Sequence, residues 1–151
     1  MSIHYFEDFV AGQTIELGEH AFTSESIIAF AREYDPQTMH TDPELARGSP
    51  YGGLIASGWH TAGAYMRLLV DNLISGTVSL GSPGLDHLRW LKPVRPGDVL
   101  RARITIIETT ASRSRSDRGI VRSRGEMINQ HDEVVMDVEA VNFYGRRPQG
   151  D

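Results

Sequence analysis

The sequence predicts an α+β fold in which an antiparallel sheet wraps around one long central helix. A long helical pattern begins near Gly58, after a first half of mixed character. From about Leu85 onward, apolar residues recur at every second position, as in strands with one buried face. These strands follow directly on one another, which favours antiparallel pairing. The length of 151 residues fits one domain, so a single domain is expected over residues 1–151.

The first half of the chain predicts a short strand and two helices. The strand is expected around Gln13–Leu17. Thr23 or Ser24 can cap the helix that follows, because either side chain accepts from free backbone N–H groups. Pro36 disfavours the helical conformation at Asp35, so this helix is expected to end there. The segment TDPELA then predicts a second short helix, with its aspartate as cap and its proline in the first turn.

The segment from about Gly58 to Leu73 has the pattern of a buried central helix. Its small residues, in the run AGA, would let the helix lie very close to a sheet. The apolar stripe expected to face that sheet is formed by Trp59, Ala62, Met66, Leu69, Val70 and Leu73.

The second half predicts a run of strands. LDHLRWL is a short strand, RPGD is a turn, and RGIVRSRGEMIN and EVVMDVEAVNFYG form a hairpin closed by Gln130–Asp132. The buried face of the strand DVLRARITIIE is expected to consist of Leu100, Ala102, Ile104 and Ile106. A sheet of this kind has an edge strand, and exposed edges tend to pair. A homodimer with a continuous sheet is therefore expected.

The segment EYDPQTMHTD is a candidate for proton-transfer chemistry. Asp35 and His40 are five residues apart, with Pro36 keeping the intervening backbone out of a helix. In a tight loop this spacing can place a carboxylate opposite an imidazole, whose unperturbed pKa is near neutrality. Such a pair can take a proton from water, and Gln37 can hold the loop or orient that water. The plainer alternative is a solvated or locally hydrogen-bonded Asp and His.

The segment GGLIASGWHT brings a glycine-rich loop into the start of the central helix. The first turn of a helix has free N–H donors and the positive end of the helix dipole. A thioester carbonyl placed there would have its developing enolate oxygen stabilised. Gly58 has no side chain to keep a substrate away from the backbone. The alternative is an ordinary helix start with Ser57 as its cap.

Both segments, together with LDHLRWLKPVRPGD, resemble the MaoC-like dehydratases, a family that includes the (R)-specific enoyl-CoA hydratases. The matching stretches FAREYDPQTMHTD, GGLIASGWHTAGAYMRLLVD and LRWLKPVRPGD lie in the family's order and cover most of residues 23–103. The resemblance implies a hotdog fold and a dimer or larger oligomer. It also implies a tunnel that admits the pantetheine arm of coenzyme A or of an acyl carrier.

The resemblance further implies a reversible hydration of 2-enoyl thioesters to 3-hydroxyacyl thioesters. The family's catalytic roles fall on Asp35 and His40, which activate the water, and on the backbone N–H of Gly58, which holds the thioester oxygen. No cofactor is expected beyond the coenzyme A that is part of the substrate. The best-known hydratases have Asp-x-Asn-Pro-x-His and often a His before the helix glycine. Here Gln37 and Ser57 differ from that pattern, and both are assigned to substrate binding.

Three basic residues are candidates for the phosphates of coenzyme A. Arg89, Lys92 and Arg95 lie in the matching third segment, and guanidinium and ammonium groups suit phosphate oxygens. The alternative is an exposed strand and turn whose charges are only solvated, and the resemblance favours phosphate binding.

The composition and the absence of certain motifs argue against several other classes of protein. The net charge is −5, whereas nucleic-acid-binding proteins are usually basic. There is no cysteine, which excludes disulfides and cysteine nucleophiles, and no metal-ligand spacing such as HExxH, so no metal is expected. No apolar run is long enough for a membrane span and no secretory signal is evident, so a cytoplasmic protein with no membrane partner is expected.

Two other functions remain open from the residues. A hotdog thioesterase would cleave the thioester and commonly uses a carboxylate on the central helix or a nearby loop. The central helix of this chain has only Asp71, near its far end, whereas Asp35 and His40 fit the hydratase pattern. A non-catalytic acyl-CoA-binding hotdog subunit would bind without turnover. The acyl chain length, the choice between coenzyme A and acyl carrier protein, and the physiological direction are not determined by the sequence.

Overall fold

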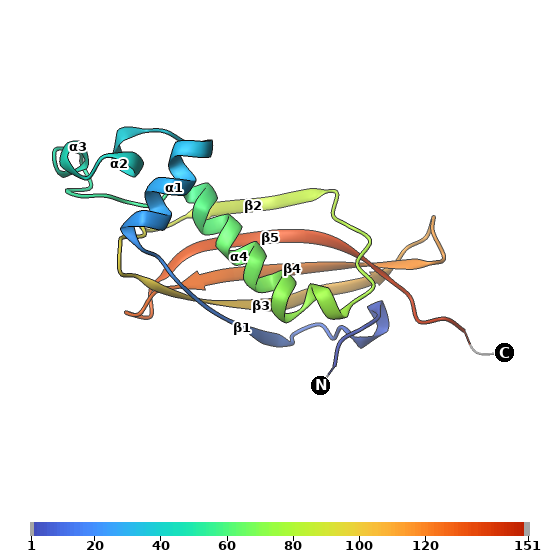
Figure 1. Cartoon of the computed structure of the whole chain (residues 1–151). Helices are drawn as coiled ribbons and strands as arrows, with labels where there is room; N and C mark the ends of the chain where they lie inside the picture. The colour runs from blue at the N-terminus through green and yellow to red at the C-terminus, as the bar shows by residue number, and fades with distance from the viewer. Residues whose placement is uncertain (1, 150–151) are drawn as a thin grey trace.

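A computed structural model describes residues 2–149 and has an antiparallel sheet of five strands in the order β1-β3-β4-β5-β2. Helix α4 (Gly58–Asn72) lies across one face of this curved sheet (Figure 1). The α+β hotdog architecture predicted from the sequence is thereby confirmed. The strands are β1 (Thr14–Ala21), β2 (Gly84–Trp90), β3 (Val99–Ala111), β4 (Arg118–Ile128) and β5 (Val134–Gly145).

Three short helices gather at one end of α4 (Figure 1). In α1 (Ser24–Tyr34), the Thr23 hydroxyl accepts from the Ser26 N–H at 3.0 Å, which confirms the predicted cap. In α3 (Pro43–Arg47), the Asp42 carboxylate caps the helix as predicted. Between them, α2 (Thr38–Thr41) is a helical turn where the sequence predicted only a loop. Two 3-10 turns, η1 (Phe6–Asp8) and η2 (Ile74–Gly76), complete the elements.

The core lies between α4 and the sheet. The predicted inner face of β3 is confirmed, since Leu100, Ala102, Ile104 and Ile106 are all buried. The residues of α4 that are buried are Thr61, Ala64, Tyr65, Leu68 and Leu69.

The predicted apolar stripe of α4 is partly wrong. Trp59 and Met66 are 57% and 48% exposed, whereas Leu69 and Leu73 are buried as expected. The sheet packs on the neighbouring side of the helix, which contains small and polar residues and therefore did not stand out as apolar. Consequently α4 has a second apolar side, next to β2, that the sheet does not cover.

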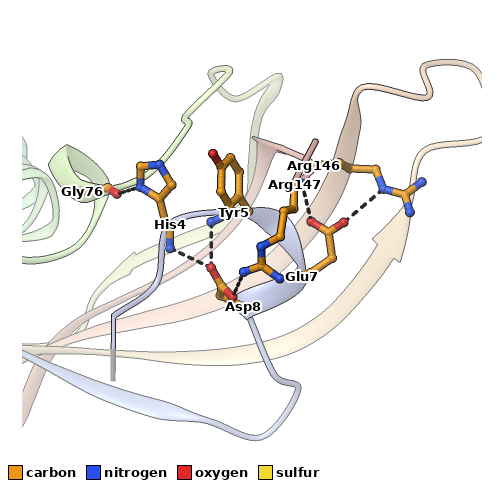
Figure 2. A network of polar contacts seen from close by, with 7 residues as sticks. All are labelled: His4, Tyr5, Glu7, Asp8, Gly76, Arg146 and Arg147. Atoms are coloured by element: carbon orange, nitrogen blue, oxygen red, sulfur yellow. Dashed lines mark hydrogen bonds and ion pairs between the residues drawn. The ribbon is translucent and has the colours of Figure 1, made fainter. Parts of the chain in front are cut away.

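The two ends of the described chain are joined by charged contacts (Figure 2). These contacts lie at the end of the sheet that is farther from α1, α2 and α3 (Figure 1). The Asp8 carboxylate accepts from the N–H groups of His4 and Tyr5, each at 3.0 Å, and pairs with Arg147. These contacts, the backbone donors first, lower the pKa of Asp8 to about 2. Glu7 accepts from the Arg147 N–H at 2.8 Å. The segment after β5 is thus fixed to η1, away from the helical cluster.

A half-buried histidine makes stability depend on pH. His60 on α4 is stacked on Phe30 with ring centroids 4.9 Å apart, and its Nδ1 has no hydrogen-bond partner in residues 2–149. Burial, and to a lesser extent the charge of His20, lowers the pKa of His60 to about 4. The unfolded-state pKa is about 6.5, so acid favours the unfolded chain.

The stabilising effect of the neutral His60 is expected to be complete above pH ~6.5 and to decline as the pH falls toward ~4. Relative to His60→Leu, wild type should lose about 1 kcal/mol more stability between neutral pH and pH ~4.5, after allowance for partial exposure. Urea unfolding at a series of pH values measures this difference. The exposed His131, changed to Gln, is the control and should leave the pH dependence as in wild type.

Candidate active site

Asp35 and His40 face each other across a small gap. Asp35 ends α1, because the proline after it removes the helical conformation, and its N–H still donates to the Ala31 carbonyl at 2.8 Å. His40 lies on α2 and is buried. The turn between the two helices brings Nε2 of His40 to 3.4 Å from Oδ2 of Asp35. The five-residue spacing therefore places the pair together, although on a helical turn and not on an open loop.

The contact on the other ring nitrogen fixes the tautomer of His40. Nδ1 lies 2.8 Å from the carbonyl oxygen of Ile55, and a carbonyl oxygen only accepts, so Nδ1 carries the hydrogen. In the neutral ring, Nε2 then has a lone pair directed at the Asp35 carboxylate. Nε2 of His40 and Oδ2 of Asp35, 3.4 Å apart, can both accept from the hydrogens of one water molecule, or they can share a single proton. This is the geometry that a general base requires.

Two side chains hold the Asp35 carboxylate in place. Gln37 donates from Nε2 to Oδ1 at 2.7 Å, and Ser57 donates from Oγ to Oδ2 at 2.7 Å. The pKa of Asp35 is lowered, first by the Gln37 hydrogen bond, against the opposing effect of burial, and then by Ser57 and the charge of His40. Ser57 is fully buried behind the carboxylate, while Gln37 also lines the cavity. The two residues assigned to substrate binding are thus positioned on Asp35.

Removing the Gln37 amide should raise the pKa of Asp35. The amide hydrogen bond favours the charged carboxylate, so Gln37→Ala removes the largest lowering contribution. We expect an upward shift in the titration of the Asp35 carboxyl carbon followed by NMR. The exposed Gln130, changed to Ala, is the control. An unchanged titration curve in Gln37→Ala would show that the amide does not hold the carboxylate in solution.

Gly58 opens α4 beside this pair. Ser57 accepts from the Trp59 N–H at 3.2 Å, so the ordinary capping role is present as well. No group in the described residues accepts from the Gly58 N–H. A Cβ added to Gly58 would lie 2.4 Å from the Trp90 ring, so the indole lies directly on the glycine. Any other residue at this position would have to displace the Trp90 ring.

A cavity of about 520 Å³ joins these groups. Asp35, His40 and Gly58 all line it, and its other walls include both tryptophans of the chain, Trp59 and Trp90. The two indoles meet edge to face with centroids 5.1 Å apart. A carboxylate, an imidazole nitrogen and a free backbone donor therefore open into one space.

The three predicted phosphate-binding residues are placed differently. Lys92 lines the cavity and pairs with Glu133. Arg95 lies beside it, where its guanidinium donates to the Tyr51 carbonyl at 2.7 Å, and Arg89 is exposed on β2. Neither arginine is part of the cavity wall.

The sequence interpretation missed Tyr51 as a residue of the site. It lines the cavity from the loop between α3 and α4. The available signal was an aromatic residue in the glycine-rich segment GSPYGG, since loops on a rigid scaffold often bear binding residues.

Neither a metal cluster nor a membrane-spanning helix is found in the described part of the chain. Among residues 2–149, no group of three or more His, Cys, Asp or Glu side chains is placed to hold a metal ion. The described helices include none with the length and apolar character needed to cross a bilayer.

Comparisons with known proteins agree on one family. Residues 8–125 match a family model described as MaoC like domain. The uncharacterized protein YdeM of Bacillus subtilis is 30% identical over 134 residues, which cover 88% of this chain and 93% of YdeM. A 3-hydroxybutyryl-CoA dehydratase of Methylorubrum extorquens is 29% identical over 153 residues, covering 100% of this chain and 90% of the dehydratase. The crystal structure of a MaoC-like dehydratase from Rhodospirillum rubrum has 42% identity and a TM-score of 0.88, with 96% and 99% of the two chains covered.

Proposed function

The chain belongs to the MaoC-like domain family, and from this membership we propose that it reversibly hydrates 2-enoyl thioesters to 3-hydroxyacyl thioesters. The observation that supports this reaction most directly is the Asp35–His40 pair, whose facing acceptors open into the same cavity as the free N–H of Gly58. A relative of nearly full coverage is a dehydratase of a 3-hydroxyacyl-CoA, which agrees with the proposal.

The proposed reaction needs only the residues of this site. A water molecule between Asp35 Oδ2 and His40 Nε2 loses a proton to the pair as its oxygen adds to the β-carbon. The electrons of the carbon–carbon double bond move toward the thioester oxygen, where the Gly58 N–H stabilises the enolate. The pair then returns the proton to the α-carbon. The sum is the addition of one water molecule, and the reverse sequence is the dehydration.

The cavity also has features suited to the carrier arm of the thioester. Lys92 at its wall provides a cation, and Arg95 and Arg89 lie outside it. We therefore assign coenzyme A or acyl-carrier phosphates first to Lys92, with the two arginines as outer contacts. Binding there would displace Glu133 from Lys92.

The reaction is tested with crotonyl-CoA and a panel of longer and branched enoyl-CoAs. Loss of the enoyl-thioester absorbance without thiol release is the expected result. Release of free thiol without hydration would indicate a thioesterase. That outcome is not favoured by the structure, because Asp71 of α4 pairs with Arg67 at 2.7 Å and does not line the cavity. Binding of the whole panel without turnover would indicate a non-catalytic acyl-CoA-binding subunit.

We further propose that two copies associate through β2 and the uncovered side of α4. β2 is an edge strand of the sheet, and the exposed side chains of Met66 and Leu85 lie beside that edge. Edge strands and exposed apolar patches both favour association.

Sedimentation should therefore show a dimer for wild type. Met66→Glu and Leu85→Glu should weaken it by at least tenfold in Kd, because a charge would be buried in the contact. Ile107→Glu on β3, which changes an equally exposed apolar residue, should leave the dimer intact. A monomeric wild type would contradict the proposal.

A further inference from the structure

Thr61 of α4 lines the catalytic cavity, although the proposed reaction gives it no role. Its backbone N–H donates to the Ser57 carbonyl at 3.2 Å, so Thr61 lies one helical turn after Ser57. Residues four apart in a helix share one face. Thr61 therefore lies directly below the residue whose hydroxyl holds the Asp35 carboxylate.

The Thr61 hydroxyl lacks the contact that a helical threonine usually makes. Threonine hydroxyls in helices often donate to the backbone carbonyl three or four residues earlier. Two other threonines of this chain do so, since Thr41 donates to the Gln37 carbonyl at 3.1 Å and Thr77 to the Ile74 carbonyl at 2.7 Å. Within residues 2–149, the Thr61 hydroxyl has no partner of this kind.

The missing partner indicates where the Thr61 hydroxyl points. Among the described residues, the only buried side-chain nitrogen or oxygen without a hydrogen-bond partner is Nδ1 of His60. The unpaired Thr61 oxygen is therefore not sealed in the core, although the residue as a whole is only 2% exposed. Thr61 lines the catalytic cavity, so the small accessible part of its side chain includes the hydroxyl and opens into that cavity.

The catalytic pair lies close to this hydroxyl. Oγ of Ser57 lies 2.7 Å from Oδ2 of Asp35, and Oδ2 in turn lies 3.4 Å from Nε2 of His40. Side chains at positions i and i+4 of a helix have Cβ atoms about 5–6 Å apart. Thr61 thus flanks the Asp35–His40 pair on the side toward α4.

The reacting water has one contact that the pair does not provide. A water molecule has two hydrogens and two lone pairs. In the proposed reaction the hydrogens point to Asp35 and His40, and one lone pair attacks the β-carbon, so the second lone pair can accept a hydrogen bond. Gln37 was expected to orient this water, but its amide donates to Asp35 at 2.7 Å.

We propose that the Thr61 hydroxyl donates a hydrogen bond to the oxygen of the reacting water, and then to the 3-hydroxyl oxygen that this water becomes. A neutral hydroxyl suits this contact, because it directs the lone pairs without protonating the nucleophile. The contact fixes the water in line with the β-carbon, which is how positioning contributes to rate. This inference rests on the proposed function, because it adds a contact to the same water.

Thr61→Val and Thr61→Ser separate this role from packing. Valine keeps the shape of threonine and loses the hydroxyl, so kcat for hydration should fall about 10- to 100-fold while KM changes less than about threefold. Serine keeps the hydroxyl and should retain kcat within about fivefold of wild type. If Thr61 only fills space, the order is reversed, because valine then fits and serine leaves a gap. Thr77→Val, which removes a paired hydroxyl far along the chain, is the control and should retain wild-type kcat.

Binding of unreactive probes shows which atom of the substrate Thr61 contacts. The probes are butyryl-CoA and both enantiomers of 3-hydroxybutyryl-CoA, with the corresponding hexanoyl and octanoyl sets, in the Asp35→Asn background where turnover is slow. Trp59 and Trp90 are the only tryptophans and both line the cavity, so their fluorescence reports occupancy. One hydroxylated enantiomer should bind more tightly than the plain chain. Thr61→Val should reduce that preference about tenfold and leave the affinity for the plain chain unchanged.

Wild-type kcat in Thr61→Val would overturn the inference, as would a preference for the hydroxylated probe that survives this substitution. An equal loss of affinity for plain and hydroxylated probes would also overturn it, because the contact would then be to the thioester group. Failure of the proposed function has a different appearance, since wild type would hydrate none of the enoyl-CoAs. The binding of the paired probes would then decide by itself whether Thr61 contacts a 3-hydroxyl oxygen.

Discussion

Replacing His40 with alanine is expected to lower kcat for hydration about 10³-fold, within the range that general acid–base groups contribute. The side chain is buried, its Nδ1 hydrogen is given to the Ile55 carbonyl, and only Nε2 is available to water. Alanine removes that acceptor without adding charge. KM should change much less than kcat, because the lost interaction acts on the water and not on the acyl group.

Asp35→Asn is expected to cause a similar loss while keeping the shape of the site. The amide cannot accept a proton, and it meets the Gln37 amide and the Ser57 hydroxyl where the carboxylate accepted from both. Stopped-flow loss of the enoyl absorbance measures kcat for both variants. The control is Asp42→Asn, a nearby helix cap outside the cavity wall, which should retain near-wild-type kcat. Full activity in His40→Ala would refute the assignment of the base.

The parts of the fold with local causes were predictable from the sequence. Thr23 and Pro36 determine the two ends of α1 through contacts with residues only a few positions away. In β3, apolar and polar residues alternate because only one face of the strand is buried. The pairing of Asp35 with His40 is also local, since five residues limit how far apart they can lie.

Features that depend on distant segments were not predictable. Ser57 meets Asp35 across 22 positions of sequence, so no spacing rule connects a helix cap with the catalytic carboxylate. The side of α4 that the sheet covers depends on close approaches such as Tyr65 over Gly125, which are tertiary contacts. A helical pattern with two apolar sides does not show which one meets the sheet. The exposed side was therefore taken for part of the core.

Gly58→Ala is expected to lower kcat/KM about 100-fold, because misplacement of a substrate by about 1 Å can have an effect of that size. The new Cβ would lie 2.4 Å from the Trp90 ring and would also stand beside the free N–H. The Trp90 indole must then move into the cavity, or the thioester must stay farther from the donor. Gly63→Ala on the same helix is the control, since a Cβ there meets nothing within 4 Å.

A double-mutant cycle separates these two causes. Trp90→Ala removes the ring that the methyl group introduced by Gly58→Ala would strike, so a role of Gly58 in packing alone predicts that Gly58→Ala becomes harmless in the Trp90→Ala background. A role in substrate approach predicts that Gly58→Ala still lowers kcat/KM at least tenfold in that background, because the methyl group still blocks the backbone donor. We expect the second result. That result would show that the absence of a side chain at Gly58 is needed for the thioester oxygen to reach the backbone N–H. Steric conflict with Trp90 could not explain it, because Trp90→Ala has already made room for the added methyl group.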